Sequence, residues 1–195
     1  MANLERGPET AARERRAAAR SCGTCSLCCT VLRVDELGKR AGEDCRHQCG
    51  EQGCGIYETR PPICRSYQCL WRQGGLEEDE RPDATGGIVD LESVGVGLRL
   101  GIRLRERGHF ERSPMLLAIA ERYRSEMPVR ITDAEDVMNP DRPFQVLLPE
   151  GVSHRVEGTR VDIYHDGVLV EQRVLGWADR WARRVSIWWR NRRLQ

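Results

Sequence analysis

The sequence predicts an α+β protein in which a cysteine-rich N-terminal lobe of short helices and loops packs on a small antiparallel sheet with flanking helices. Two observations predict this class. All nine cysteines fall between positions 22 and 69 of the 195 residues. Short β-branched runs and helix-like segments then follow one another in the rest of the chain. We therefore expect a polar helix in residues 1–20, a cysteine-cluster domain in 21–75 and an α+β region in 76–195.

The first region changes character abruptly at the cysteines. Residues 8–20 are rich in Ala, Arg and Glu and predict an exposed polar helix, with Pro8 and Thr10 as start signals. From Ser21 to about Gly75, cysteine, glycine and proline dominate and apolar periodicity is poor. Such a stretch buries too little apolar surface to fold alone, so another component must organise it. Gly74 to Ala84, which is acidic, predicts an exposed linker.

The region after the linker combines strands with one well-marked helix. Ser113-Pro114 predicts the helix start, with serine as N-cap and proline in the first turn. We expect this helix to end at Pro128 and to bury one face. That face consists of Leu116, Leu117, Ala120 and Tyr123. Strands are predicted for Gly86 to Glu92, Val94 to Arg103, Val129 to Thr132, Phe144 to Leu148, Arg160 to Tyr164 and Val168 to Val174.

The chain finishes with a hairpin and a helix rich in tryptophan and arginine. His165-Asp166-Gly167 lies between two alternating runs and predicts a hairpin turn. The helix is expected from about Gly176 to Arg193, and at helical spacing Trp177, Trp181, Val185 and Trp188 share one face. The favoured interpretation is that these tryptophans dock the helix on the strands. A peripheral membrane contact or a protein partner bound through this C-terminal region is the alternative.

Charge and hydropathy exclude several classes of protein. With 31 basic and 30 acidic residues the formal net charge is +1, so no nucleic-acid partner is expected. No secretory signal and no apolar run long enough to cross a membrane is present, so we expect a cytoplasmic protein. Thiols stay reduced there, and clustered cysteines then bind metal or act in catalysis more often than they form disulfides.

The cysteine spacing indicates a metal site. The order is C-x2-C-x2-C-C, followed by single cysteines. Two thiolates at C-x2-C spacing can grip one ion or one cluster, as in zinc ribbons and iron–sulfur loops. Adjacent Cys28 and Cys29 point apart in most backbones, which favours two neighbouring metals. Nearby arginines can offset the negative charge of the thiolates; these are Arg46, Arg60, Arg65 and Arg72.

The motif also resembles a known family. CGTCSLCC from Cys22, followed by Cys45 and by GCGIYETRPPICRSYQCLW from Gly53, is similar to the YkgJ family of cysteine-cluster proteins, proposed zinc- or iron-chelating domains. The resemblance covers about the first third of the chain. It implies eight metal ligands: Cys22, Cys25, Cys28, Cys29, Cys45, Cys54, Cys64 and Cys69. Cys49 lies outside the family pattern, and His47 fits a surface position better than a ligand position.

The function predicted from these observations is metal binding. Iron, as an iron–sulfur cluster or as iron alone, is preferred because C-x2-C-x2-C resembles part of a ferredoxin run, and zinc is the alternative. Eight thiolates favour a polynuclear site. No catalytic motif accompanies the cysteines, so no reaction or catalytic residue is predicted. The alternatives are an iron–sulfur-dependent redox or protein-modifying enzyme and a zinc-folded protein-interaction module.

Overall fold

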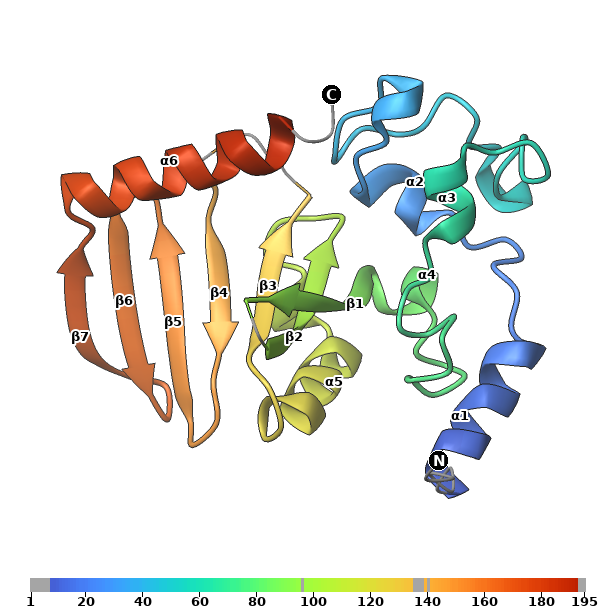
Figure 1. Cartoon of the computed structure of the whole chain (residues 1–195). Coiled ribbons are helices and arrows are strands. Elements are labelled where there is room, and N and C mark those ends of the chain that lie inside the picture. Colours follow the sequence, from blue (N-terminus) through green and yellow to red (C-terminus); the bar gives the residue numbers. More distant parts are fainter. Residues whose placement is uncertain (1–7, 96, 135–138, 140, 193–195) are drawn as a thin grey trace, which may run out of the picture.

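One seven-stranded sheet forms the centre of the protein (Figure 1). The computed structural model describes residues 8–95, 97–134, 139 and 141–192. The strands lie side by side in chain order: β1 (Gly87–Val94), β2 (Gly97–Leu104), β3 (Val129–Asp133), β4 (Phe144–Leu147), β5 (Val152–Glu157), β6 (Arg160–His165) and β7 (Val168–Val174). The mixed α and β content is therefore as predicted.

The sheet differs from the prediction in size and in direction. Neighbouring strands are antiparallel except for β2 and β3, which are parallel, with Ile102 opposite Ile131. The helix α5 (Pro114–Arg124) lies between these two strands in the chain and forms the crossover that parallel neighbours require. The sheet is therefore larger than the small antiparallel sheet that was expected, and one of its strand pairs is parallel. The segment Val152–Glu157, which lacks clear alternation, supplies a strand that the sequence pattern did not reveal.

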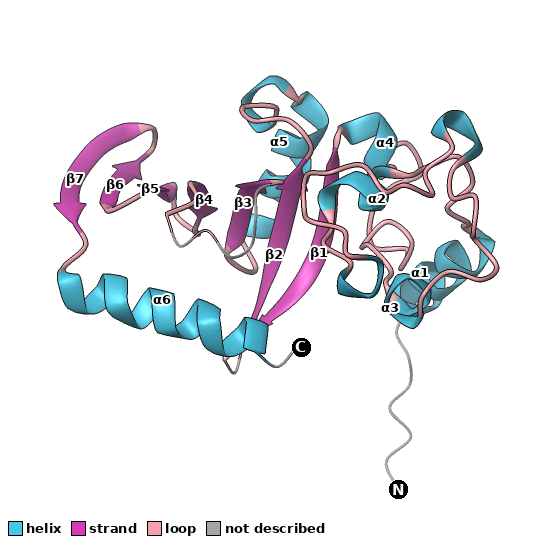
Figure 2. Ribbon diagram, turned by 90° about the horizontal axis from the view of Figure 1, so that it is seen from above, coloured by secondary structure: helices cyan, strands magenta, loops and turns pink. Residues whose placement is uncertain are grey.

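The remaining helices are short in the cysteine region and longer at the two ends of the chain. They are α1 (Pro8–Ala19), α2 (Leu27–Val31), η1 (Asp35–Leu37), η2 (Gly50–Gln52), α3 (Pro62–Ser66), α4 (Pro82–Thr85), η3 (Phe110–Arg112) and α6 (Trp177–Arg192). The cysteine-rich segment lies beside β1, at one edge of the sheet, and β7 forms the opposite edge (Figures 1 and 2). None of the described helices is both long and apolar enough to span a bilayer.

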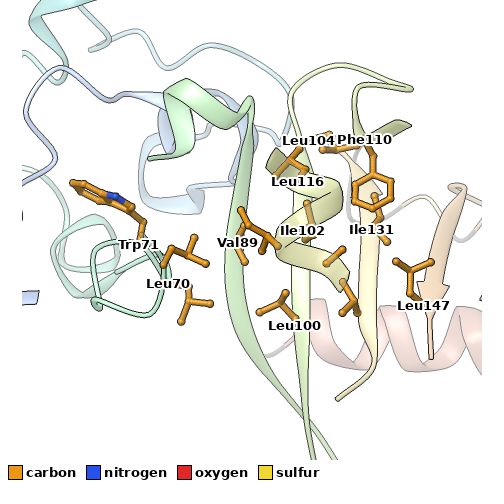
Figure 3. Close-up of a cluster of buried hydrophobic side chains, with 14 residues drawn as sticks. Leu70, Trp71, Val89, Leu100, Ile102, Leu104, Phe110, Leu116, Ile131 and Leu147 are labelled. Atoms are coloured by element: carbon orange, nitrogen blue, oxygen red, sulfur yellow. The ribbon is translucent and has the colours of Figure 1, made fainter. Parts of the chain in front are cut away.

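The hydrophobic core lies between α5 and one face of the sheet (Figure 3). Leu116 and Ile119 of α5 are fully buried against Leu100, Ile102 and Val129 of the strands. Burial of each such side chain stabilises the fold by about 1.5–3 kcal/mol. Leu70, Trp71 and Leu76 extend the same core beyond β1. Residues on both sides of the expected boundary at 75/76 therefore share one core.

Helix α5 begins as predicted and ends earlier. The hydroxyl of Ser113 accepts a hydrogen bond from the Leu116 amide at 3.4 Å, with proline next in the chain, as in a standard N-cap. The helix ends at Arg124 rather than at Pro128. Its buried face includes Ile119, whereas Leu117, which was expected there, is 42% exposed.

The hairpin between β6 and β7 confirms the turn prediction. Its strands end at His165 and begin again at Val168, which pair with each other. The two residues between them, Asp166 and Gly167, have φ values of 50° and 80°. Positive φ at both central positions is the geometry of a type I′ turn, whose twist matches that of the strands.

The segment expected as an exposed acidic linker is exposed at Glu77, Glu78 and Asp79 but is held by contacts at Leu76 and Glu80. Leu76 is 1% exposed, and the buried Glu80 forms an ion pair of 2.7 Å with Arg122 of α5. Arg20, which follows α1, donates to the carbonyl oxygens of Trp71 at 2.6 Å and Leu76 at 2.9 Å. Acidic composition alone suggested solvent exposure, but a basic partner on another element binds one of these acids.

The last helix is not docked by its tryptophans. Trp177 is 80% exposed and Trp181 67% exposed, so the favoured interpretation of this face was wrong. Arg183, on another face, donates to the Gly158 carbonyl at 3.3 Å and lies over the Phe144 ring at 5.1 Å. Helical spacing shows which residues share a face, but not what covers that face. A membrane or protein contact stays a prediction, and Arg193 lies outside the described residues.

Candidate metal centre

One cavity of about 780 Å³ gathers the predicted thiols. Its lining includes all eight cysteines of the family pattern: Cys22, Cys25, Cys28, Cys29, Cys45, Cys54, Cys64 and Cys69. The ninth, Cys49, does not line the cavity and is exposed. All nine thiols are free of disulfides. The division of the cysteines made from the sequence therefore coincides with their division in space.

The first four cysteines are placed by a tight turn followed by a short helix. The Cys25 amide donates to the Cys22 carbonyl at 2.9 Å, which closes the first C-x2-C turn. Cys28 and Cys29 lie on α2, whose Leu27 and Val31 are buried against Ile88 of β1. Apolar contact with the sheet thus holds the helix that carries the adjacent pair.

Backbone hydrogen bonds bring the later cysteines of the loop to the first four. The Cys45 amide donates to the Cys29 carbonyl at 2.9 Å, so Cys45 lies directly against α2. The Gly55 amide donates to the His47 carbonyl at 2.8 Å and closes the small loop that carries Cys54. These bonds join positions up to sixteen residues apart, and spacing in the sequence does not predict them.

The last two cysteines connect the cavity to the sheet. Cys64 lies on α3, which begins in the rigid Pro61-Pro62 segment. After Cys69 the Leu70 amide donates to the Val89 carbonyl of β1 at 2.7 Å. Burial raises the pKa of the Cys69 thiol to about 11, because a thiolate is poorly solvated there.

The adjacent thiols interact with each other. A side-chain hydrogen bond between Cys28 and Cys29 lowers the pKa of Cys29 to about 7 and raises the pKa of Cys28. Lys39 and Arg60 also favour the Cys29 thiolate. Both residues line the same cavity, although adjacency had suggested that their side chains point apart.

Lys39, the chain's one lysine, is a structural part of this site that the sequence analysis did not identify. It is 7% exposed, and its ammonium group donates to the carbonyl oxygens of Thr30 at 2.9 Å, Arg40 at 3.0 Å and Leu32. Two of these carbonyls belong to the C-terminal end of α2, where a cation is favourable. Its charge also lies near the thiols of Cys29 and Cys45.

The predicted arginines are only partly placed at the cavity. Arg60, Arg65 and Arg72 line it, and Arg46 does not. Arg60 stacks on the Tyr57 ring at 3.7 Å, while Arg72 donates to the Ala17 carbonyl of α1 at 2.7 Å. These cations can offset the charge of several thiolates.

His47 and Cys49 occupy different positions. His47 is half-buried and lines the cavity. Its Nε2 atom accepts a hydrogen bond of 3.2 Å from Nε of Arg46. The Cys49 thiol is exposed and donates to the His47 carbonyl at 3.7 Å. Cys49 therefore serves well as a thiol control for the eight in the cavity.

The cysteine sulfur atoms are suitable ligands for thiophilic metals, although they are not arranged at the distances of a complete coordination site. Across residues 8–95, 97–134, 139 and 141–192, no three Cys, His, Asp or Glu side chains are close enough to hold one ion. Zinc, iron and iron–sulfur clusters accept thiolate ligands, and the cavity wall supplies eight. A bound metal would draw these side chains inward, as in sites where binding and local folding are coupled.

A charged layer on the sheet was not identified from the sequence. Tyr67, from the cysteine region, donates to the Asp90 carboxylate of β1 at 2.5 Å, and Arg103 of β2 pairs with both Asp90 and Glu92. Arg99 pairs with Glu92 at 2.6 Å. The signal was present, because these residues occupy the polar positions of alternating strands. Tyr67 of the cysteine region covers part of these positions.

Comparisons with protein-family models, with curated proteins and with solved structures gave no match. The similarity of the cysteine motif to the YkgJ family therefore stays a prediction.

Proposed function

We propose that this protein binds metal through the eight thiols of the cysteine cavity, which are Cys22, Cys25, Cys28, Cys29, Cys45, Cys54, Cys64 and Cys69. The observation that supports this proposal best is that one cavity contains all eight and leaves out Cys49. Cysteines that served only to fill space in the fold would not be expected to line one common cavity. Thiolates gathered around a common space are the usual ligands of zinc and of iron–sulfur clusters.

The number of thiols favours more than one metal ion. A tetrahedral zinc ion takes four ligands, and a cubane or rhombic iron–sulfur cluster also takes four. Eight thiols are enough for two such sites or for one cluster beside a second ion. We prefer iron, as a cluster or alone, and hold zinc as the alternative. The adjacent Cys28 and Cys29 are compatible with either metal, since one thiolate can bridge two metal ions.

Metal analysis of protein purified without oxygen tests the proposal. We expect bound iron with acid-labile sulfide and absorption near 400 nm, or bound zinc in a colourless protein. Protein that carries neither metal after expression with both supplied, and that takes up neither on reconstitution, would overturn the proposal.

A pair of cysteine variants tests which thiols bind. Cys25→Ala removes a thiol that lines the cavity, whereas Cys49→Ala removes an exposed thiol outside it. We expect Cys25→Ala to lower the metal content per chain and the melting temperature, because a ligand is lost and metal binding stabilises the fold. Cys49→Ala should change neither. Equal metal content in the two variants would contradict the assignment of ligands.

A further inference from the structure

Besides the thiols, the cavity is lined by four arginines from the sheet and from the segment that leads into β4. Arg99 and Arg103 of β2, Arg130 of β3 and Arg142 line the same 780 Å³ space as the eight cysteines. A cavity of this volume is within the range of pockets that hold small organic ligands, about 300–1,000 Å³. One or two metal ions occupy a small part of such a space. The cavity therefore has room for a small ligand beside the metal, in contact with these arginines.

Two of these arginines are already neutralised. Arg99 is held by Glu92 at 2.6 Å, and Arg103 is held by both Glu92 and Asp90. Gly101 allows this arrangement, because a Cβ there would lie 2.7 Å from Oε1 of Glu92. The two carboxylates and two guanidinium groups balance in charge, so this network offers no net attraction to a ligand.

Arg130 lies next to this network and is not balanced. It pairs with Gly101 in the parallel register of β2 and β3, so its side chain leaves the same face of the sheet as Arg99 and Arg103. Its Nε atom is buried without a hydrogen-bond partner, and its guanidinium group forms no ion pair within the described part of the chain. The guanidinium carbon of Arg130 lies over the Phe144 ring, 4.3 Å from the ring centre, and the residue lines the cavity.

The surroundings of Arg130 are cationic. Its pKa is lowered to about 9 by burial first and then by the charges of Arg99 and Arg142, with Arg183 of α6 acting in the same direction. Glu92 is the carboxylate that opposes this effect, and it is already bound to Arg99 and Arg103. A half-buried cation among other cations is costly unless an anion joins it.

We propose that Arg130 binds the carboxylate or phosphate group of a small ligand that occupies the cavity beside the thiols. Arg130 lines the cavity, and the planar guanidinium group can offer two parallel N–H donors to such an oxyanion. This inference names a class of ligand for the cavity. It rests on the proposed function only in so far as the ligand is expected to lie beside a bound metal. The contact between Arg130 and the anion is independent of the metal.

Anion titration of the full-length protein tests this inference. Inorganic phosphate and acetate are the two probes, each compared with sodium chloride at equal ionic strength, and metal content is measured before and after. Binding is followed by calorimetry and by the melting temperature, which a ligand specific for the folded state raises with its concentration. A response to phosphate alone or to acetate alone identifies which oxyanion the site takes. No response to either beyond that to chloride would overturn the proposal.

Variants assign the response to the residue. Arg130→Met should weaken the binding of the effective probe about tenfold or more, since hydrogen bonds to a charged partner are lost. Without anion it should fold and melt no lower than the wild type, because a half-buried cation without an anionic partner is gone. Arg130→Lys should bind with intermediate affinity, because it keeps the charge and loses the fork.

A matched control keeps the outcomes distinct. Arg155→Met removes an arginine that is 51% exposed on β5 and lies outside the cysteine cavity, and it should respond to anions as the wild type does. Unchanged anion binding by Arg130→Met, or its failure to fold in anion-free buffer, would refute the assignment. If instead the protein held no metal while Arg130 still bound anions, the proposed metal function would fail and this inference would stand.

Discussion

Removal of the Arg103 guanidinium group tests how the cysteine region is joined to the sheet. Arg103 pairs with Asp90, which is 7% exposed and also accepts a hydrogen bond of 2.5 Å from Tyr67. Tyr67 lies in the cysteine region and Asp90 on β1, so the three side chains connect the two parts. Arg103→Met keeps the length of the side chain and leaves the Asp90 carboxylate buried without its cation.

The expected cost follows from the partners that are left. Breaking a fully buried ion pair from one side costs about 3–5 kcal/mol. Here Glu92 keeps Arg99, and Asp90 keeps Tyr67. The Arg103 side chain is also 30% exposed, so water reaches part of the pair. We therefore expect a loss of about 2–3 kcal/mol in the free energy of unfolding.

Urea denaturation at neutral pH measures this loss, with the wild type and the variant in the same metal state. The double variant Asp90→Asn with Arg103→Met should recover about 1 kcal/mol or more relative to Arg103→Met, because the unpaired carboxylate is gone. Arg155→Met, at an exposed position on β5, should stay within about 0.5 kcal/mol of the wild type. A loss below about 1 kcal/mol for Arg103→Met, or a double variant less stable than the single one, would refute the reasoning.

Two further predictions concern stability, each measured by urea denaturation at constant metal content. Lys39→Met leaves one buried and two partly buried carbonyl oxygens without a charged donor and should cost about 2–4 kcal/mol; a cost under 1 kcal/mol would show that water replaces the ammonium group. Ile119→Ala, at a fully buried position in α5, should cost about 3 kcal/mol, and Leu117→Ala, at a 42% exposed position, less than about 1 kcal/mol; equal costs would contradict the assignment of the buried face.

Local rules account well for some elements of the fold. The Ser113 cap and the His165–Val168 turn depend on a few neighbouring residues, so their chemistry can be read directly from the chain. The face of α5 was predicted less well, because helical spacing admits both Leu117 and Ile119 near its margin and only the position of the sheet selects Ile119. The end of α5 was also misplaced, since Pro128 only limits how far a helix can extend.

The charged residues show most clearly what local rules miss. Glu80 was assigned to an exposed linker, but Arg122, 42 residues later, binds it. Asp90, Glu92 and Arg130 occupied ordinary polar positions of strands, and the cysteine region and α6 turn those positions into a partly covered layer. Alternation identifies the two faces of a strand; what lies on each face depends on segments far away in the chain.

The sequence by itself predicted the composition of the candidate metal centre, since the resemblance of its cysteine motif to the YkgJ family separated eight cysteines from Cys49. The tertiary structure alone decided that these eight thiols line one cavity, because the bonds that join Cys45 to Cys29 and Leu70 to Val89 link distant parts of the backbone. The tertiary structure also decided that Arg130 lies at the cavity without an anionic partner among the described residues, and that the tryptophans of α6 are exposed. Ligand chemistry belongs to individual residues and can be recognised in a sequence. Convergence, burial and charge balance belong to pairs of residues and require the fold.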